Sequence, residues 1–170
     1  MSKWMTNQSR KSIEYCVIGS RHPWKPLTIT SYSVADESTG PGIWHMDVTL
    51  YKTIDNIVAC IYILIDNKSR FILNWKVFSY LSGKVSLNMV RESFYKYIIP
   101  ACNNNEGTML LVDGGLENNN LDMDNFLNQE LVPIRKLIAQ KDIKFSNSMV
   151  EAFNKTLKYR HLFPHNIADY

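Results

Sequence analysis

An uninterrupted apolar run, Ile57–Ile65, constrains the fold of this 170-residue chain more than any other feature. The run is rich in β-branched residues, which favour strands, and it is far shorter than the roughly 18 residues that a membrane-spanning helix needs. A strand without alternation between apolar and polar positions is typical of one covered on both faces. The run therefore predicts a central strand of a sheet that carries packed structure on either side.

Regular patterns on both sides of this run predict a mixed α/β domain. Turn residues at Asp66–Ser69 lead into the strand that follows the apolar run, so that strands 43–51, 57–65 and 71–80 form an antiparallel meander. Apolar residues at helical spacing alternate with two later strands, and such crossovers join strands in one sheet. The later elements are helices at 85–98, 122–131 and 148–161 and strands at 108–112 and 134–139.

Composition excludes several classes of protein. With 45% apolar and 21% charged residues, the chain is neither disordered nor fibrous. The three cysteines, Cys16, Cys60 and Cys102, are odd in number and widely spaced, so they form no disulfide framework. No secretory signal opens the chain. We therefore expect a soluble, reduced, cytoplasmic protein with no membrane partner.

The charges are unevenly distributed along the chain. The net charge is +4 for residues 1–30, −5 for residues 31–131 and +5 for residues 132–165. An acidic middle between basic segments suits a metal site surrounded by an anion-binding surface, although ordinary variation in surface charge explains it too.

The domain boundaries follow from composition. Residues 1–40 contain prolines, serines and threonines and the basic cluster Arg21–Lys25, which is interpreted as an extended linker. Residues 41–165 hold the regular patterns and are the expected folded core, and residues 166–170 are a tail.

The common catalytic motifs are missing, which leaves carboxylates as candidates. The chain has no phosphate-binding glycine loop, no Gly-x-Ser-x-Gly elbow, no His-Glu-x-x-His and no Cys-x-x-Cys. Asp47 lies in mid-strand, Asp113 follows a strand directly before two glycines, and Glu151 lies in the first turn of the last helix. Carboxylates from separate elements can converge on Mg²⁺, which prefers hard oxygen ligands.

Both aspartates also have purely structural interpretations. In the structural interpretation, Asp47 is an acid on an edge strand or the ion-pair partner of Lys52 or Arg70. Asp113 in its alternative shapes the turn at the two glycines that follow it. Three nearby residues are interpreted as packing and edge residues: Trp44, His45 and Trp75.

The last helix is open to two interpretations as well. Ser148 and Glu151 match a Ser-x-x-Glu capping box, in which the carboxylate would serve the helix start. Glu151, Lys155 and Lys158 share one face, either as a solvated ion-pair face or as a row of charges beside a phosphate backbone.

Four ordered segments, covering about Pro41 to Leu162, resemble the catalytic cores of retroviral integrases and bacterial insertion-sequence transposases, the Asp-Asp-Glu recombinases. The segments resemble, in that order, the family's Pro-Gly-x-x-Trp-x-x-Asp-x-Thr strand, Ile-Asp-x-x-Ser-Arg hairpin, Asp-x-Gly-x-Glu turn and Glu-x-x-Asn-Lys-x-x-Lys helix. The matching segments are Gly40–Tyr51, Ile65–Arg70, Leu111–Glu117 and Glu151–Lys158.

The resemblance implies a ribonuclease H-like fold, with a five-stranded mixed sheet flanked by helices. It further implies an enzyme that cleaves the ends of an element's double-stranded DNA and joins the 3′-hydroxyl to target DNA, by in-line transfer with two Mg²⁺ or Mn²⁺ ions. A homodimer or higher synaptic assembly is implied as well. By matching position, Asp47, Asp113 and Glu151 are the catalytic and metal-binding residues. The residues implied to contact DNA are Asn147, Asn154, Lys155 and Lys158.

The sequence departs from the family pattern at several points. The 37 residues between Asp113 and Glu151 are slightly more than is usual, and Val112 and Gly114 replace the family's common neighbours of the second aspartate. No end-recognition module is evident, so we expect a catalytic core, either excised from a longer transposase or encoded as a short one. The alternatives are a catalytically inactive DNA-binding or synapsis module and a structure-specific nuclease on the same fold.

Overall fold

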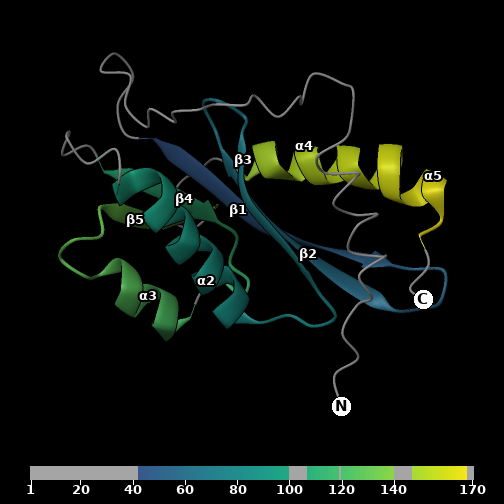
Figure 1. Cartoon of the computed structure of the whole chain (residues 1–170), viewed down its shortest axis with the longest axis horizontal. Helices are drawn as coiled ribbons and strands as arrows, with labels where there is room; N and C mark the ends of the chain where they lie inside the picture. Colours follow the sequence, from purple (N-terminus) through teal and green to yellow (C-terminus); the bar gives the residue numbers. More distant parts are fainter. Residues whose placement is uncertain (1–41, 100–106, 119, 140–146, 168–170) are drawn as a thin grey trace.

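A five-stranded mixed sheet forms the centre of the protein, in the order β3-β2-β1-β4-β5 (Figure 1). The computed structural model describes residues 42–99, 107–118, 120–139 and 147–167. The predicted linker, residues 1–40, lies outside the described residues, and the proposed domain boundaries stay predictions. The strands are β1 (Ile43–Lys52), β2 (Val58–Asp66), β3 (Ile72–Phe78), β4 (Thr108–Val112) and β5 (Ile134–Ile138).

The strand directions confirm the predicted topology. β1, β2 and β3 form an antiparallel meander, whereas β4 pairs in parallel with β1 and β5 pairs in parallel with β4. Asp66 closes the turn between β2 and β3, because its Oδ2 accepts hydrogen bonds from the backbone N–H of Ser69 at 2.7 Å and from its hydroxyl at 2.6 Å. The side chain thus replaces backbone partners in a tight turn.

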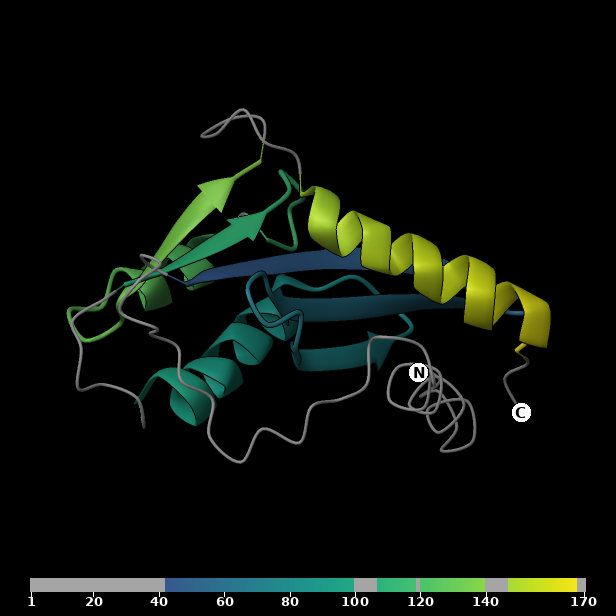
Figure 2. The ribbon, with the colours of Figure 1, turned by 90° about the horizontal axis from the view of Figure 1, so that it is seen from above.

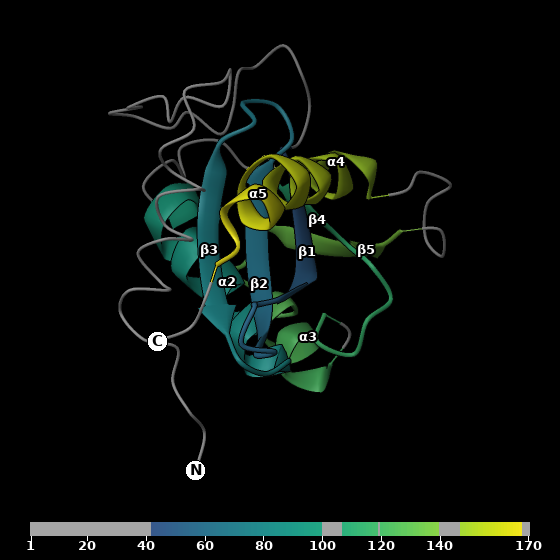
Figure 3. The same ribbon diagram turned by 90° about the vertical axis from the view of Figure 1, so that its right-hand side faces the viewer.

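β2 is covered on both faces, as its apolar sequence predicts. Cys60, Tyr62 and Leu64 belong to one buried cluster and Ile61 and Ile63 to another, since successive side chains of a strand point to opposite faces. Figures 2 and 3 show a helix on each side of the sheet, with α4 on the face opposite α2. The protein is therefore built in three layers around two separate cores.

One face of the sheet is packed against α2 (Gly83–Ser93), its continuation η1 (Phe94–Ile98) and α3 (Leu121–Leu127). The predicted helix at 122–131 ends earlier than expected. Gln129 and Val132 donate backbone hydrogen bonds into successive turns, and Leu131 is 83% exposed. Since nothing packs on Leu131, no burial favours helix over these turns.

The opposite face is packed against α4 (Ser148–Leu157), which continues through η3 (Lys158–Leu162) into α5 (Phe163–His165). This helix runs beyond its predicted end because Leu162 and Ile167 are buried in the same cluster as Val150. Asn166 then ends it in the left-handed conformation, with a φ of 46°.

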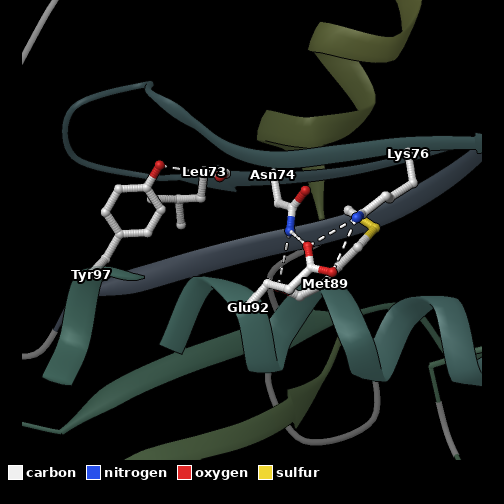
Figure 4. A network of polar contacts seen from close by, with 6 residues as sticks. All are labelled: Leu73, Asn74, Lys76, Met89, Glu92 and Tyr97. Atoms are coloured by element: carbon white, nitrogen blue, oxygen red, sulfur yellow. Dashed lines mark hydrogen bonds and ion pairs between the residues drawn. The ribbon is translucent and has the colours of Figure 1, made fainter. Parts of the chain in front are cut away.

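A polar network joins α2 to the edge strand β3 (Figure 4). The Glu92 carboxylate accepts hydrogen bonds from Asn74 Nδ2 at 3.0 Å and from Lys76 Nζ at 3.1 Å. Burial raises the pKa of Glu92, but these two hydrogen bonds and the charge of Lys76 outweigh it and leave the pKa lowered. Tyr97 adds a hydrogen bond from its hydroxyl to the backbone of β3. These contacts hold α2 in place on the face away from α4.

Within the described part of the chain, no helix is long and apolar enough to cross a membrane. Cys60 is a free thiol buried in β2. Cys16 and Cys102 lie outside the described residues.

Candidate active site

Asp47 lies in the middle of β1 and faces α4. Trp44 and Met46 are buried with α2 and α3 on one side of the strand, so the alternating residues His45 and Asp47 point to the other. Asn154, buried on α4, donates a hydrogen bond from Nδ2 to Asp47 Oδ2 at 2.7 Å. Asp47 is thus held by an amide of the helix that packs above it.

Asp113 immediately follows β4, the parallel neighbour of β1. The register pairs His45 with Leu111, and its continuation by two residues brings Asp113 beside Asp47. Asp113 Oδ1 accepts hydrogen bonds from the backbone N–H of Gly115 at 3.2 Å and from Asn118 Nδ2 at 2.7 Å. Both bonds end on Oδ1. The carboxylate therefore shapes the turn with one oxygen and leaves Oδ2 for another partner.

The two glycines after Asp113 differ in what surrounds them. A Cβ at Gly115 would overlap the carboxylate of Glu117, which is the end of a flexible side chain and can move away. A Cβ at Gly114 would meet only a methyl group of Ile138, at 4.0 Å. The departure from the family pattern at Gly114 is therefore not forced by lack of space.

Glu151 is exposed in the first turn of α4, and the predicted capping box is not formed. The helix begins at Ser148 with Asn147 as N-cap, and no side chain caps it. The Glu151 backbone N–H donates to the backbone carbonyl of Asn147 at 3.2 Å. The helix start therefore does not engage the Glu151 carboxylate.

Asn147 is buried rather than exposed towards a ligand. Its exposed fraction is 2%, and its amide contacts His45 and the backbone of Met46. Lys155 is exposed on α4, and Lys158, the first residue of η3, is partly exposed. Of the four residues implied to contact DNA, the two lysines are therefore accessible, whereas both asparagines lie inside.

The three carboxylates share one electrostatic environment. The pKa of Asp47 is raised from 3.8 to about 6, first by burial, then by the negative charge of Asp113 and, to a smaller extent, of Glu151. Hydrogen bonds from the Val48 backbone and Asn154 oppose this rise. Like charges disfavour ionisation of a carboxyl group, so a cation placed among the three would be attracted strongly.

The side chains around Asp47 and Asp113 offer oxygen ligands of the kind that hard cations prefer. Among the described residues, no three His, Cys, Asp or Glu side chains are close enough together to hold a metal ion. Asn118 and Asn154, which orient the two aspartates, each have a buried amide oxygen that finds no hydrogen-bond partner in the described part of the chain. Carboxylate and amide oxygens are ligands that Mg²⁺ accepts, so the residues present fit such an ion.

No protein-family model and no curated protein matches this sequence. Solved structures do match. A chain of the simian T-cell lymphotropic virus intasome in complex with PP2A regulatory subunit B56 gamma is similar over 76% of this chain, with a TM-score of 0.56 and 16% identity. The HTLV-2 integrase catalytic core domain in complex with magnesium, in its trimeric form, is similar over 77% of this chain and 78% of its own, with a TM-score of 0.53 and 15% identity.

The fold is that of a retroviral integrase catalytic core. The ribonuclease H-like sheet expected from the sequence motifs is thereby confirmed. The matched part corresponds to 44% of the intasome chain, so the protein spans less than half the length of that relative. At 15–16% identity the likeness concerns the fold, and the chemistry has to be argued from this chain's own residues.

Two residues next to the carboxylates were not predicted as part of the site. Asn118 holds Asp113, and nothing in its sequence context distinguishes it from the other asparagines of its loop. His45 was interpreted as a packing residue. Its position two residues before Asp47 is a signal, because a spacing of two in a strand places both side chains on the same face.

Proposed function

We propose that this protein is a metal-dependent polynucleotidyl transferase that cuts DNA ends and joins the resulting 3′-hydroxyl to a target strand. The observation that carries the proposal is the gathering of three carboxylates: the pKa of Asp47 is raised to about 6, first by burial and then by the negative charges of Asp113 and Glu151. A soluble fold gains nothing from placing like charges together, and perturbed carboxylates gather where they serve a ligand or a reaction.

Asp47, Asp113 and Glu151 would hold Mg²⁺ or Mn²⁺. Two such ions, when bound, stabilise the attacking and leaving oxygens of an in-line phosphoryl displacement. The chain's own residues fix the ligands in advance: Asn154 holds Asp47, and Asn118 with the Gly115 N–H holds Asp113. Fixing ligands before the reaction lowers the cost of reorganisation during it.

Lys155 and Lys158 would bind the phosphates of the DNA end. They follow Glu151 by four and seven residues, Lys155 on α4 and Lys158 at the start of its continuation η3, so the three side chains lie along one face of the helix. A lysine is a mobile point charge and suits phosphate contacts that position a strand without reading its sequence. A homodimer or larger assembly belongs to the same proposal, since two DNA ends joined in concert require two active sites.

Replacing both Lys155 and Lys158 by Gln is expected to weaken DNA binding and to flatten its dependence on salt. The logarithm of the binding constant falls as the logarithm of the salt concentration rises, and each lost phosphate contact makes this slope shallower by about 0.9. The slope of the double variant should therefore be shallower by about 1.8. The measurement is fluorescence anisotropy with a labelled duplex at several NaCl concentrations, in EDTA so that metal binding plays no part.

The matched control is a double Gln variant of Lys84 and Lys96, which are exposed on α2 and η1 across the sheet from α4. It removes the same charge and is expected to change the slope much less. Equal slopes for the two double variants would show that α4 is not the DNA path.

Strand joining tests the proposed reaction. The protein is incubated with Mg²⁺ or Mn²⁺, duplexes with free 3′-hydroxyl ends and a supercoiled plasmid, and junctions are sequenced. Covalent junctions between duplex and plasmid support the proposal. Cutting without joining identifies a nuclease on the same fold. DNA retention with no metal-dependent cutting or joining identifies a binding module.

A further inference from the structure

Asn147 connects two of the three carboxylates through its own hydrogen bonds. Its side-chain Nδ2 donates to the backbone carbonyl of Met46 at 2.9 Å, one residue before Asp47. Its backbone carbonyl accepts the N–H of Glu151 at 3.2 Å. Asn147 thus links the strand that carries Asp47 to the helix turn that carries Glu151, beside the bond that Asn154 makes to Asp47 itself.

His45 completes this connection. The Met46 carbonyl can only accept a hydrogen bond, so it fixes Nδ2 of Asn147 as the atom facing it and leaves Oδ1 facing His45 Nδ1, at 2.7 Å. An amide oxygen also only accepts, so the proton lies on His45 Nδ1. The exposed fractions are 7% for His45 and 2% for Asn147. Loss of either partner would leave a buried polar atom of the other without its bond.

A direct role of Asn147 in DNA contact conflicts with these bonds. To reach a phosphate, the amide would have to break its bonds to His45 and to Met46 and leave a buried position. The exposed side chains of α4 contact solvent without such a cost. The geometry therefore favours a role for Asn147 that is exerted through Glu151.

We propose that Asn147 and His45 are paired positioning residues that set the separation of Asp47 and Glu151 and thereby control how tightly a divalent cation is held. The proposal rests on the proposed function in one respect only, namely that the carboxylates bind such a cation. The hydrogen bonds themselves belong to the folded protein whatever its activity.

Four variants of the full chain test the pair. Asn147→Ala and His45→Leu each remove one side of the bond, and a double variant removes both. His45→Asn keeps a donor, since its Nδ2 occupies nearly the place of the imidazole Nδ1. The measurements are Mn²⁺ affinity by calorimetry, duplex affinity in EDTA by anisotropy, and amide hydrogen exchange of α4. Urea unfolding establishes that each variant is folded.

Mn²⁺ affinity is expected to fall about tenfold or more in Asn147→Ala and His45→Leu, the usual effect of removing a residue that orients a metal ligand. The double variant should lose no more than the worse single variant, because the two residues act as one unit. His45→Asn should recover most of the affinity. Duplex affinity in EDTA should not change, and exchange should accelerate in the first turn of α4 while its C-terminal half stays protected.

Other outcomes overturn the proposal. Duplex affinity in EDTA that falls in Asn147→Ala, with Mn²⁺ affinity intact, makes Asn147 a DNA contact. If Mn²⁺ affinity and exchange are both unchanged, the pair positions nothing. If the wild-type chain binds no Mn²⁺, the proposed function fails together with the control of cation affinity, and hydrogen exchange then decides only whether the pair positions the start of α4. Acceleration confined to the first turn of α4 and reversed in His45→Asn supports it, whereas unchanged exchange refutes it.

Discussion

An Asp113→Asn variant is expected to lose at least about 10³-fold in DNA joining while it keeps its fold. The amide oxygen of Asn can still accept the bonds from the Gly115 N–H and from Asn118 that shape the turn. The change falls on Oδ2, which becomes an NH₂ group that cannot bind a cation. Metal stabilisation of a phosphoryl transition state amounts to several kcal/mol, which corresponds to this loss in rate.

The measurement is the initial rate of junction formation with Mg²⁺, beside circular dichroism and urea unfolding of the same samples. Asp122→Asn is the matched control, because Asp122 is an exposed acid on α3 and the chemical change is the same. We expect wild-type activity from it. Full activity of a folded Asp113→Asn protein would remove Asp113 from the reaction and, with it, the proposed mechanism.

The sheet was predictable because its signals are local. The apolar run at Ile57–Ile65 predicted a strand covered on both faces, and β2 is such a strand, displaced by one residue. Turn residues at Asp66–Ser69 marked a real turn, where the Asp66 side chain bonds the backbone. Hydrophobic pattern and turn chemistry act over a few residues, and both are visible in a single sequence.

The helix ends were less predictable because tertiary contacts decide them. α3 ends at Leu127 because nothing packs on Leu131, and the last helix extends to His165 because Leu162 and Ile167 are buried. The same reason explains the capping box. Ser148 and Glu151 have the spacing of a capping box in which Ser148 is the N-cap. In the structure the N-cap is Asn147, one residue earlier, and its side chain is hydrogen-bonded to β1.

The candidate site could be predicted as a set of carboxylates but not as a network. Asp47 stood out because acids are rare in mid-strand, Asp113 because it ends a strand directly before two glycines, and Glu151 by its place in the first turn of the last helix. The polar residues that hold them did not. Asn147 bonds His45 across 102 positions of sequence and Asn154 bonds Asp47 across 107. An asparagine carries no local sign of whether it faces DNA or a buried partner, so the resemblance implied DNA contacts where the structure has internal hydrogen bonds.

Without divalent cations, an Asp47→Asn variant is expected to be more stable than the wild-type protein at pH 8, by about 1–3 kcal/mol. The pKa of Asp47 rises from 3.8 to about 6 on folding, so the folded state binds this proton more tightly than the unfolded chain. The wild-type protein therefore loses stability as the pH rises from about 4 through 6. Asn carries no charge and escapes this loss, while its amide oxygen still accepts the bond from Asn154.

Urea unfolding in EDTA at pH 4 to 8 measures the difference. The two proteins should be about equally stable at pH 4. The difference between their free energies of unfolding should grow as the pH rises through about 6 and then stay constant. Asp122→Asn should track the wild type at every pH. Mg²⁺ at the same high concentration should then stabilise the wild type more than Asp47→Asn, since at a given concentration a ligand that binds the folded state more tightly stabilises it more. A variant that gains no stability at pH 8 would mean that neither burial nor the neighbouring carboxylates disfavour ionised Asp47, and the electrostatic case for a cation at this site would fall with it.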